Sequence, residues 1–236
     1  MSARIEDLAY ILHKRAYKES SYIIEFFTRT HGVISAVAKG AKTSKSRFYL
    51  NLQLFTQLEI GLAGTSELLT LTQADVSKAV RMTAQKNIFC GYYVNELVLR
   101  LLHRHDQHSQ LFDFYDRLIA SLKDAAAPEP LLRHFEMALL TEIGYGVDFS
   151  CTVDGKAIKD EQYYLVSPEQ GVTETTASQA SDMRVSGKTL NDLVAGALSN
   201  DTSLRESKRL MRRILQYHLG HKPLKTRDLF APTAGN

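Results

Sequence analysis

The sequence is poor in cysteine, lacks tryptophan and has no long apolar run. Its two cysteines, Cys90 and Cys151, are too few and too far apart for a disulfide framework or a cysteine metal cluster. No stretch reaches the roughly 18 apolar residues of a membrane span. Glu6 and Asp7 stand near the N-terminus, where a signal peptide would carry basic residues. We therefore expect a cytoplasmic protein with no membrane partner.

Sequence patterns of catalysis are also missing. There is no complete Gly-x-x-x-x-Gly-Lys-Ser/Thr loop, no Gly-x-Ser-x-Gly and no Cys-x-x-Cys. Three histidines and Asp106 occur in "HRHDQH", residues 103–108, but His103 and His105 would point to different sides of a helix. We therefore expect neither an enzyme nor a cofactor, and a metal-dependent enzyme that uses His103, His105 and His108 is kept as an alternative.

The N-terminal part of the chain predicts an all-β unit. Short runs rich in β-branched and aromatic residues, with turn residues between them, lie at 8–13, 21–27, 32–39 and 67–74. Between 50 and 62, apolar and polar residues alternate, which predicts a strand with one buried face. Five short strands in so few residues favour a closed barrel, because a small open sheet would leave its edges exposed.

Helical periodicity dominates from about residue 79, so we divide the chain into domains 1–78 and 79–236. The expected helices lie at 87–104, 111–122, from Pro128 to Gly144, at 189–198, and from a capping-box pattern at Ser203 to Gly220. Residues 145–185 lose this periodicity, with a hairpin or irregular excursion at 162–172. The fold class is therefore α+β: a five-stranded barrel followed by a mostly helical domain with an irregular insertion.

Positive charge is concentrated, although the formal net charge is only +3. Four cations fall within nine residues of "VAKGAKTSKSRFYL": Lys39, Lys42, Lys45 and Arg47. No acid occurs between Glu25 and Glu59. Such a loop can neutralise several phosphates and release their counterions, and Tyr17, Phe48 and Tyr49 are near enough in sequence to stack on bases. A solvated loop with scattered lysines is the alternative.

A second cationic region lies near the C-terminus. Between residues 205 and 227 the only acid is Glu206. The cations are Arg205, Lys208, Arg209, Arg212, Arg213, Lys222, Lys225 and Arg227. Leu204, Met211, Ile214 and Leu215 predict the buried stripe of this helix, which places the cations on its other side. With few acids at i,i+4 to neutralise them, an acidic ligand is favoured over an ordinary charged helix face.

Four segments in this order resemble one family: "VAKGAKTSKS", "NELVLRLL", "PEPLLRHFEMALLTEIGYGVDFSC" and "GHKPLKTRDLF". They closely resemble RecO, the bacterial DNA repair and recombination mediator family, in its proteobacterial form, over nearly the whole chain. The resemblance implies an N-terminal OB-fold, a helical C-terminal domain, and binding of single- and double-stranded DNA. It also implies annealing of complementary strands and, with the partner RecR, loading of RecA on DNA coated by single-strand-binding protein.

The resemblance also implies roles for particular residues. The DNA-binding set would be Lys39, Lys42, Lys45, Arg47, Arg15, Arg209, Arg212, Arg213, Lys222 and Lys225. The helical domain would bind the acidic, phenylalanine-ended tail of single-strand-binding protein. Such a peptide requires an apolar pocket for its ring and a cation for its carboxylate, and Leu132, Arg133 and Phe135 offer both. A surface arginine in a first helical turn is the alternative at position 133.

The insertion departs from the family, because many members hold a four-cysteine zinc site there. Here only Cys151 remains, Asp154 stands where a second cysteine would, and the later pair is absent. Structural zinc usually needs four ligands, so we expect a degenerate zinc-finger-like insertion without metal. An OB-fold RNA-binding protein with no repair role is the remaining alternative, since the basic loop would serve either nucleic acid and only RNA has a 2′-OH to read.

Overall fold

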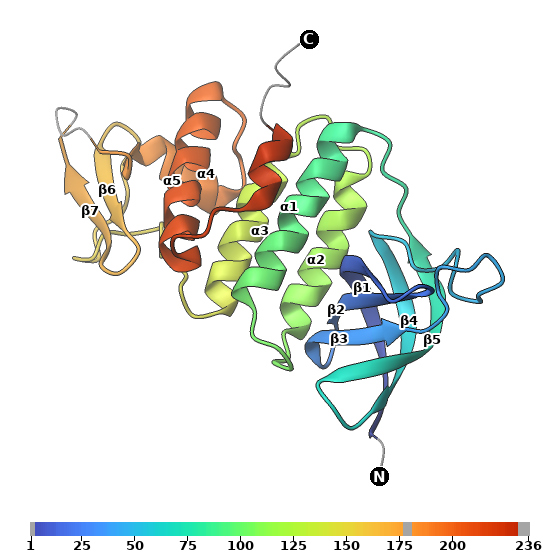
Figure 1. Cartoon of the computed structure of the whole chain (residues 1–236). Coiled ribbons are helices and arrows are strands. Elements are labelled where there is room, and N and C mark those ends of the chain that lie inside the picture. Colours follow the sequence, from blue (N-terminus) through green and yellow to red (C-terminus); the bar gives the residue numbers. More distant parts are fainter. Residues whose placement is uncertain (1–2, 177–180, 231–236) are drawn as a thin grey trace. The chain divides into compact units, whose positions relative to one another are not determined.

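A computed structural model describes residues 3–176 and 181–230 (Figure 1). The chain forms two compact units: unit 1 is Met1–Ala125 with Thr226–Asn236, and unit 2 is Ala126–Lys225. None of the helices in the described ranges combines the length and the apolar character needed to cross a membrane.

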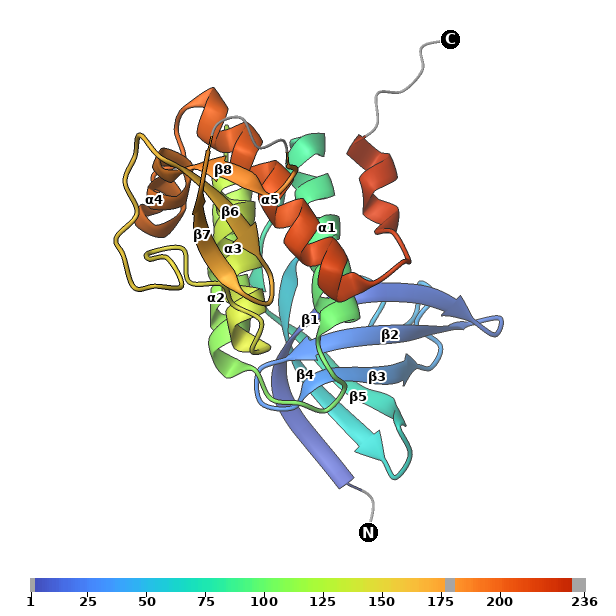
Figure 2. The same ribbon diagram turned by 90° about the vertical axis from the view of Figure 1, so that its left-hand side faces the viewer.

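Unit 1 contains the predicted five-stranded barrel. Its strands are β1 (Ala3–Tyr17), β2 (Ser21–Thr28), β3 (Gly32–Ala38), β4 (Thr56–Gly64) and β5 (Leu68–Ala79). They close in the order β1-β2-β3-β5-β4 (Figure 2). Neighbours are antiparallel except β3 and β5, which pair in parallel. Closure leaves no edge of the sheet unpaired. This is why five short strands in the sequence favoured a barrel over an open sheet.

The barrel core follows from strand alternation. Ile11 lies opposite Phe26, which lies opposite Ile34, so three strands contribute one layer of fully buried side chains. Burial of each contributes about 1.5–3 kcal/mol. Tyr10 and Phe27, paired on the other face of β1 and β2, pack against aromatic rings of a helix at centroid distances of 4.9 to 5.8 Å.

The strand predicted at 50–62 is wrong in its first part, because β4 begins only at Thr56. Residues 48–55 form turns and irregular structure, and Leu50 is 77% exposed. Phe48 and Leu52 are nevertheless buried in the barrel core. Both side chains fill the barrel core although neither residue belongs to a strand. The alternation of apolar and polar residues before Thr56 therefore marks a loop that closes the end of the barrel.

Two helices complete unit 1 with a short C-terminal 3-10 segment: α1 (Gln85–Leu101), α2 (Ser109–Leu122) and η1 (Lys225–Phe230). Buried Asn95 on α1 accepts a hydrogen bond from the Tyr115 hydroxyl on α2 at 2.6 Å. Its amide nitrogen also donates to the carbonyl oxygens of Ile11 and Leu12. Strands give way to helices after Ala79, but because of such contacts the first compact unit continues to Ala125.

Unit 2 combines three helices with a small sheet. The helices are α3 (Glu129–Glu142), α4 (Gly187–Ala195) and α5 (Asp201–Leu219). The sheet has the order β7-β6-β8, from β6 (Tyr163–Ser167), β7 (Gly171–Thr175) and β8 (Arg184–Ser186). Of the two alternatives left open at 162–172, a hairpin or an irregular excursion, the hairpin is the one present. Buried Tyr164, Val166 and Val185 give the insertion a packed interior.

Helix α5 does not begin with the predicted capping box. It starts at Asp201, and the Asn200 side chain accepts a hydrogen bond from the Ser203 backbone N–H at 2.8 Å. Glu206 is directed to the start of α4 instead, where it accepts from the Ser186 N–H at 3.0 Å and the Thr189 hydroxyl at 2.5 Å. The capping box fails because Asn200 caps the helix first and the carboxylate satisfies another helix end.

Candidate nucleic-acid interface

The long loop between β3 and β4 carries the predicted cations. Lys39, Lys45 and Arg47 are exposed and Lys42 is half-buried. Buried Ala41 and Phe48 fix the loop in the barrel core. With two lysines from the end of β1 and the turn after it, these residues form what we call the barrel-loop cluster: Lys14, Lys18, Lys39, Lys42, Lys45 and Arg47.

Tyr22 joins the two halves of the barrel-loop cluster. The Lys14 and Lys42 Nζ atoms lie 5.0 and 5.7 Å from the centre of its ring. Lys14 Nζ donates to the Leu52 carbonyl oxygen at 2.8 Å, and Lys42 Nζ donates to the Lys18 carbonyl oxygen at 2.7 Å. Burial lowers the pKa of Lys14 below its ordinary value. Cations from separate segments are thus held on one ring and on backbone oxygens.

Arg47 is fixed on the barrel wall. Its guanidinium donates to the Thr72 carbonyl oxygen on β5 and lies 4.8 Å from the Phe48 ring centre. The Asn51 amide donates to the Ala74 carbonyl oxygen at 2.8 Å, which ties the next part of the loop to the same strand. The loop therefore presents its charges from defined positions.

The barrel-loop cluster has no internal counter-charge. None of its six side chains forms a salt bridge with a carboxylate in residues 3–176 or 181–230. Glu19, exposed in the turn after Lys18, is the one acid of that turn. Uncompensated cations on a barrel surface suit phosphate contacts, which position a nucleic acid without reading its sequence.

Arg15 is placed apart from this cluster. Residues 14 and 15 alternate across β1: Lys14 is paired with Ile24 of the barrel core, and Arg15 with Ile23 on the other face. Arg15 is exposed and its charge acts on Glu25. Neither Lys14 nor Lys18 was predicted. A half-buried lysine within a strand, like Lys14, has no signature in the sequence, and Lys18 is a single exposed lysine in the turn after β1.

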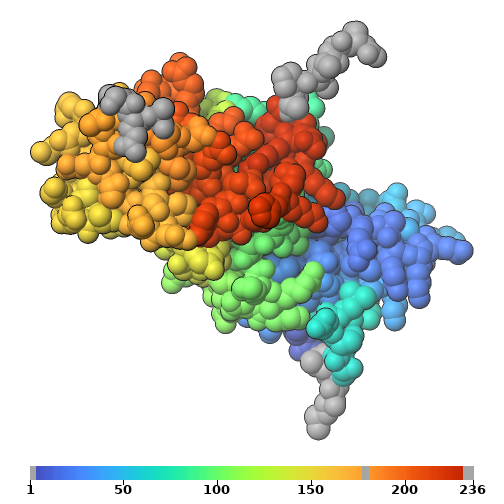
Figure 3. Space-filling view, turned by 60° about the vertical axis from the view of Figure 1, so that its left-hand side comes forward, coloured from blue at the N-terminus to red at the C-terminus, as the bar shows by residue number. Residues whose placement is uncertain are grey.

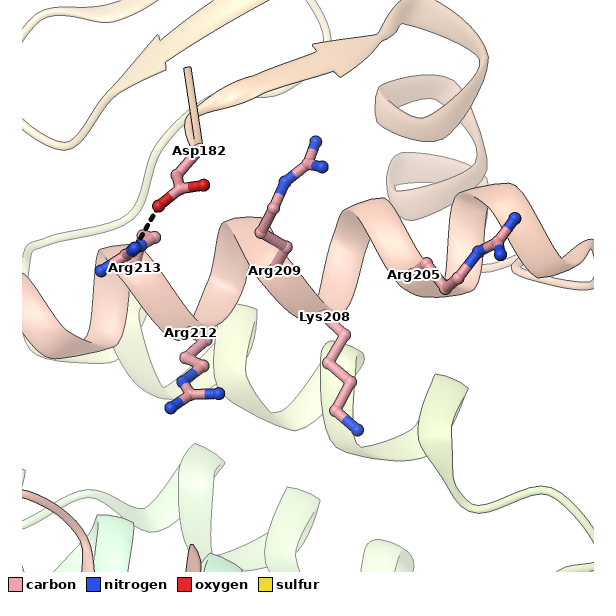
Figure 4. Close-up of a pocket in the computed structure, with 6 residues that line it drawn as sticks. All are labelled: Asp182, Arg205, Lys208, Arg209, Arg212 and Arg213. Atoms are coloured by element: carbon pink, nitrogen blue, oxygen red, sulfur yellow. Dashed lines mark hydrogen bonds and ion pairs between the residues drawn. The ribbon is translucent and has the colours of Figure 1, made fainter. Parts of the chain in front are cut away.

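The second predicted cationic region is present as one helical surface, the α5 face. Arg205, Lys208, Arg209, Arg212 and Arg213 line a pocket together with Asp182. In Figure 4, Arg209 and Arg213 lie toward the segment that carries Asp182, whereas Lys208 and Arg212 point away from that segment. Spacings of three and four residues place all five cations on one side of α5. Met211, Ile214 and Leu215 are buried on the opposite side, as expected, whereas Leu204 is only half-buried.

Neutralisation of the α5 face is slight. Arg213 pairs with Asp182, and Arg209 Nη2 donates to the Arg184 carbonyl oxygen at 2.6 Å. The other acid in reach along the helix, Glu206, is engaged at α4. Burial acts to raise the pKa of Glu206, but hydrogen bonds from Thr189 and Ser186 outweigh it and hold that pKa below its ordinary value. The carboxylate therefore stays charged in this network, and among the cations of the α5 face the charge of Arg209 also lowers its pKa.

The surroundings of α5 place the remaining C-terminal cations. Figure 3 shows the small sheet, in yellow-orange, beside α5 on one surface of unit 2, and β8 contacts α5 directly. Lys222 and Lys225 follow the helix beyond Gly220; both are exposed, and neither lines the pocket. The pocket thus gathers Arg209, Arg212 and Arg213 of the predicted set, but not these two lysines.

The residues predicted to bind a partner tail lie in the core of unit 2. Leu132 is 7%, Arg133 6% and Phe135 0% exposed. The Arg133 guanidinium is bidentate to Glu136, with Nε 2.7 Å from one carboxylate oxygen and Nη2 bonded to the other. The alternative of a surface arginine is therefore wrong. Because Arg133 is buried and bonded to Glu136, a peptide carboxylate could reach this guanidinium only after the residues around it move.

The histidine segment and the insertion show no assembled metal site. His103 and His105 are exposed, and His108 is buried at the start of α2. Cys151 donates its thiol hydrogen to Asp148, with sulfur and oxygen 3.6 Å apart. Within the described ranges, no three His, Cys, Asp or Glu side chains are grouped to hold a metal ion.

Comparison with known proteins gives one consistent family. The model "Recombination protein O N terminal" matches residues 1–80, and "Recombination protein O C terminal" matches residues 83–228. The chain is 39% identical over 227 residues to the DNA repair protein RecO of Dechloromonas aromatica, covering 94% of this chain and 93% of that protein. It is 38% identical to RecO of Nitrosococcus oceani (94% and 90% covered) and 39% identical to RecO of Coxiella burnetii (94% and 95%).

Proposed function

Because this chain belongs to the RecO family of DNA repair proteins, we propose that it acts as a recombination mediator on DNA. It binds single- and double-stranded DNA, anneals complementary strands and, with RecR, helps to load RecA on DNA coated by single-strand-binding protein. It does this at the nucleoid, in the cytoplasm, without a cofactor or a chemical step.

One observation carries the proposal: two cationic surfaces are left almost without counter-charge. Of the six cations in the barrel-loop cluster and the five on the α5 face, only Arg213 has a salt bridge to a carboxylate in the described parts of the chain. A polyanion gains affinity at such surfaces by releasing its counterions. Arg15, Lys222 and Lys225 are added to the proposed DNA contacts as exposed cations outside the two surfaces.

Annealing follows from the same electrostatics. Two DNA strands repel each other, and cations on their phosphates reduce that repulsion. Phosphate contacts carry no sequence information, so the base edges stay available for pairing with the second strand. Strand pairing supplies the driving force, and the protein supplies only the surface on which the strands meet.

Binding of single-strand-binding protein remains the finer part of the proposal. Its acidic tail would place a phenylalanine ring near Leu132 and Phe135 and its terminal carboxylate on Arg133. Since Arg133 is buried and bonded to Glu136, the tail carboxylate cannot reach the guanidinium in the arrangement that the structure shows. The site therefore requires a local rearrangement of α3.

The test is annealing of two complementary oligonucleotides coated with single-strand-binding protein, with and without the full chain. We expect clear acceleration by the chain, and a smaller one by a variant with Lys39, Lys42, Lys45 and Arg47 all changed to Ala. No acceleration by the wild-type chain would refute the mediator function. Competition between DNA and RNA strands of one sequence is the companion measurement, and a clear win for RNA would favour an RNA-binding role instead.

A further inference from the structure

An exposed apolar pair lies two and three residues after Arg47 of the barrel-loop cluster. Leu50 is 77% exposed, more than any other large apolar side chain in the described residues, and its neighbour Tyr49 is 47% exposed. Both follow Arg47 in the loop between β3 and β4. We call these two residues the tip pair. Exposure of two adjacent large apolar side chains to water is unfavourable, and such exposed apolar groups often mark a binding site.

The tip pair is exposed although its loop is firmly anchored. Phe48 and Leu52 on either side are buried in the barrel core. The Tyr49 backbone N–H donates to the Ser46 carbonyl oxygen at 3.1 Å, and the Asn51 side chain is bonded to β5. The outward direction of Tyr49 and Leu50 is therefore set by the inward anchoring of their neighbours.

The far end of the loop is locked against α1. Phe55 has a left-handed backbone conformation, with φ of 62°, and its ring lies 5.6 Å from that of Tyr92. A Cβ atom added to Gly91 would come within 2.5 Å of the Phe55 ring, so only glycine allows this contact. The loop is thus held at both ends, which reduces the entropy lost when it binds a ligand.

The ligand must offer negative charge and flat apolar surface within a few ångströms of each other. Single-stranded DNA does so, because each phosphate is followed by a base whose face is free to stack. A regular duplex presents the phosphates but hides its base faces. We propose that Tyr49 stacks on an unpaired base and that Leu50 inserts beside it, while the phosphates lie on the barrel-loop cluster.

This inference rests on the proposed DNA-binding function and deepens it, because it assigns strand selectivity to two residues. The charged side chains would bind single strands and duplexes alike, through phosphates. The tip pair would favour the single strand. It would also hold a base unstacked at the point where a complementary strand begins to pair.

The experiment uses the full chain and an oligonucleotide that carries the fluorescent base 2-aminopurine. The variants are Tyr49→Ala and Leu50→Ser, with Tyr49→Phe as the conservative form that keeps a stacking ring and Val194→Ser as an exposed apolar control on α4. Affinities for the single strand and for a duplex of the same sequence are measured by anisotropy over a range of salt concentrations. Circular dichroism checks that each variant is folded.

We expect Tyr49→Ala to weaken single-strand binding by about tenfold, in line with the loss of one stacked base, and to remove the 2-aminopurine quenching. Leu50→Ser should act in the same direction. Duplex affinity and the salt slope should stay unchanged, and Tyr49→Phe and Val194→Ser should behave as wild type. Equal losses on single strand and duplex, or no loss, would overturn the inference, as would a Leu50→Ser variant that only disrupts self-association.

Failure of this inference is distinguishable from failure of the proposed function. If the fourfold alanine variant of the loop cations loses DNA binding while Tyr49→Ala does not, only the stacking role is wrong. If the fourfold variant binds DNA as the wild type does, the barrel loop is not a DNA site, and the stacking role falls with it.

Discussion

The barrel-loop cluster of unit 1 and the buried face of α3 in unit 2 place basic side chains in opposite environments. Within the described residues, Lys14, Lys42 and Arg47 of the barrel-loop cluster contact aromatic rings and backbone carbonyl oxygens. In unit 2, Arg133 is buried and bidentate to Glu136, and Arg213 is bridged to Asp182. Carbonyl oxygens and rings orient a cation but leave its net charge for a ligand, whereas a carboxylate cancels it. The group that an arginine contacts therefore indicates its role. An arginine paired with a carboxylate stabilises the fold, and one on a ring or a carbonyl oxygen can still bind DNA.

The largest effect expected from this comparison is on the stability of unit 2. Arg133→Met would remove the bidentate arginine from buried Glu136, and breaking a buried pair in this way costs about 3–5 kcal/mol of unfolding free energy. Adding Glu136→Leu should restore most of the loss, because both charges are then gone. Urea unfolding of the wild type, the single variant and the double variant measures this.

The result also decides what Arg133 does. If Arg133→Met leaves stability unchanged, the pair does not stabilise the core, and the binding role predicted for Arg133 from the sequence is favoured. Arg133→Glu is a poor test of tail binding, because it would bury two carboxylates side by side and destabilise the fold.

A smaller effect is expected at the charged network between α4 and α5. The pKa of Glu206 is lower in the folded chain than in the unfolded chain. Its charge therefore adds stability above the unfolded pKa of about 4.3, and this contribution is lost as pH falls through the folded value. Glu206→Gln should cost about 1–2 kcal/mol near pH 7. Its deficit relative to wild type should shrink in acid.

The measurement is urea unfolding of both proteins at several pH values from 7 downwards. Ser167→Ala is the control: it removes a hydroxyl at the end of β6 that accepts backbone hydrogen bonds but does not titrate, so its deficit should not change with pH. A deficit that stays constant across this range would mean that the charge of Glu206 does not stabilise the fold.

The sequence was sufficient for the elements with strong periodicity. Most of the barrel strands and the cations of α5 follow from residue spacing along one element. The sequence could not predict contacts between residues that are far apart along the chain. Lys14 joins Lys42 only because the closed barrel brings β1 next to the loop after β3.

The burial of Arg133 could have been predicted from the sequence, but the resemblance to a peptide-binding site was given more weight. Glu136 stands three residues later on the same helical face, which already allows an intrahelical pair. The neighbouring Leu132 and Phe135 indicated burial as much as a ligand pocket. Phe48 and Leu52 led to a similar error. Both are apolar and buried in the barrel core like the residues of β4, so the predicted strand began too early.

The most direct test of the account is the salt dependence of single-stranded DNA binding. The wild type is compared with the fourfold alanine variant of Lys39, Lys42, Lys45 and Arg47, and with Asp182→Asn, which frees Arg213. If unpaired cations bind the phosphates, the fourfold variant should lose slope, by about 0.7 for each phosphate contact removed, and Asp182→Asn should steepen it slightly. A slope that is the same in all three proteins would contradict the central claim that these cations form the DNA-binding surface.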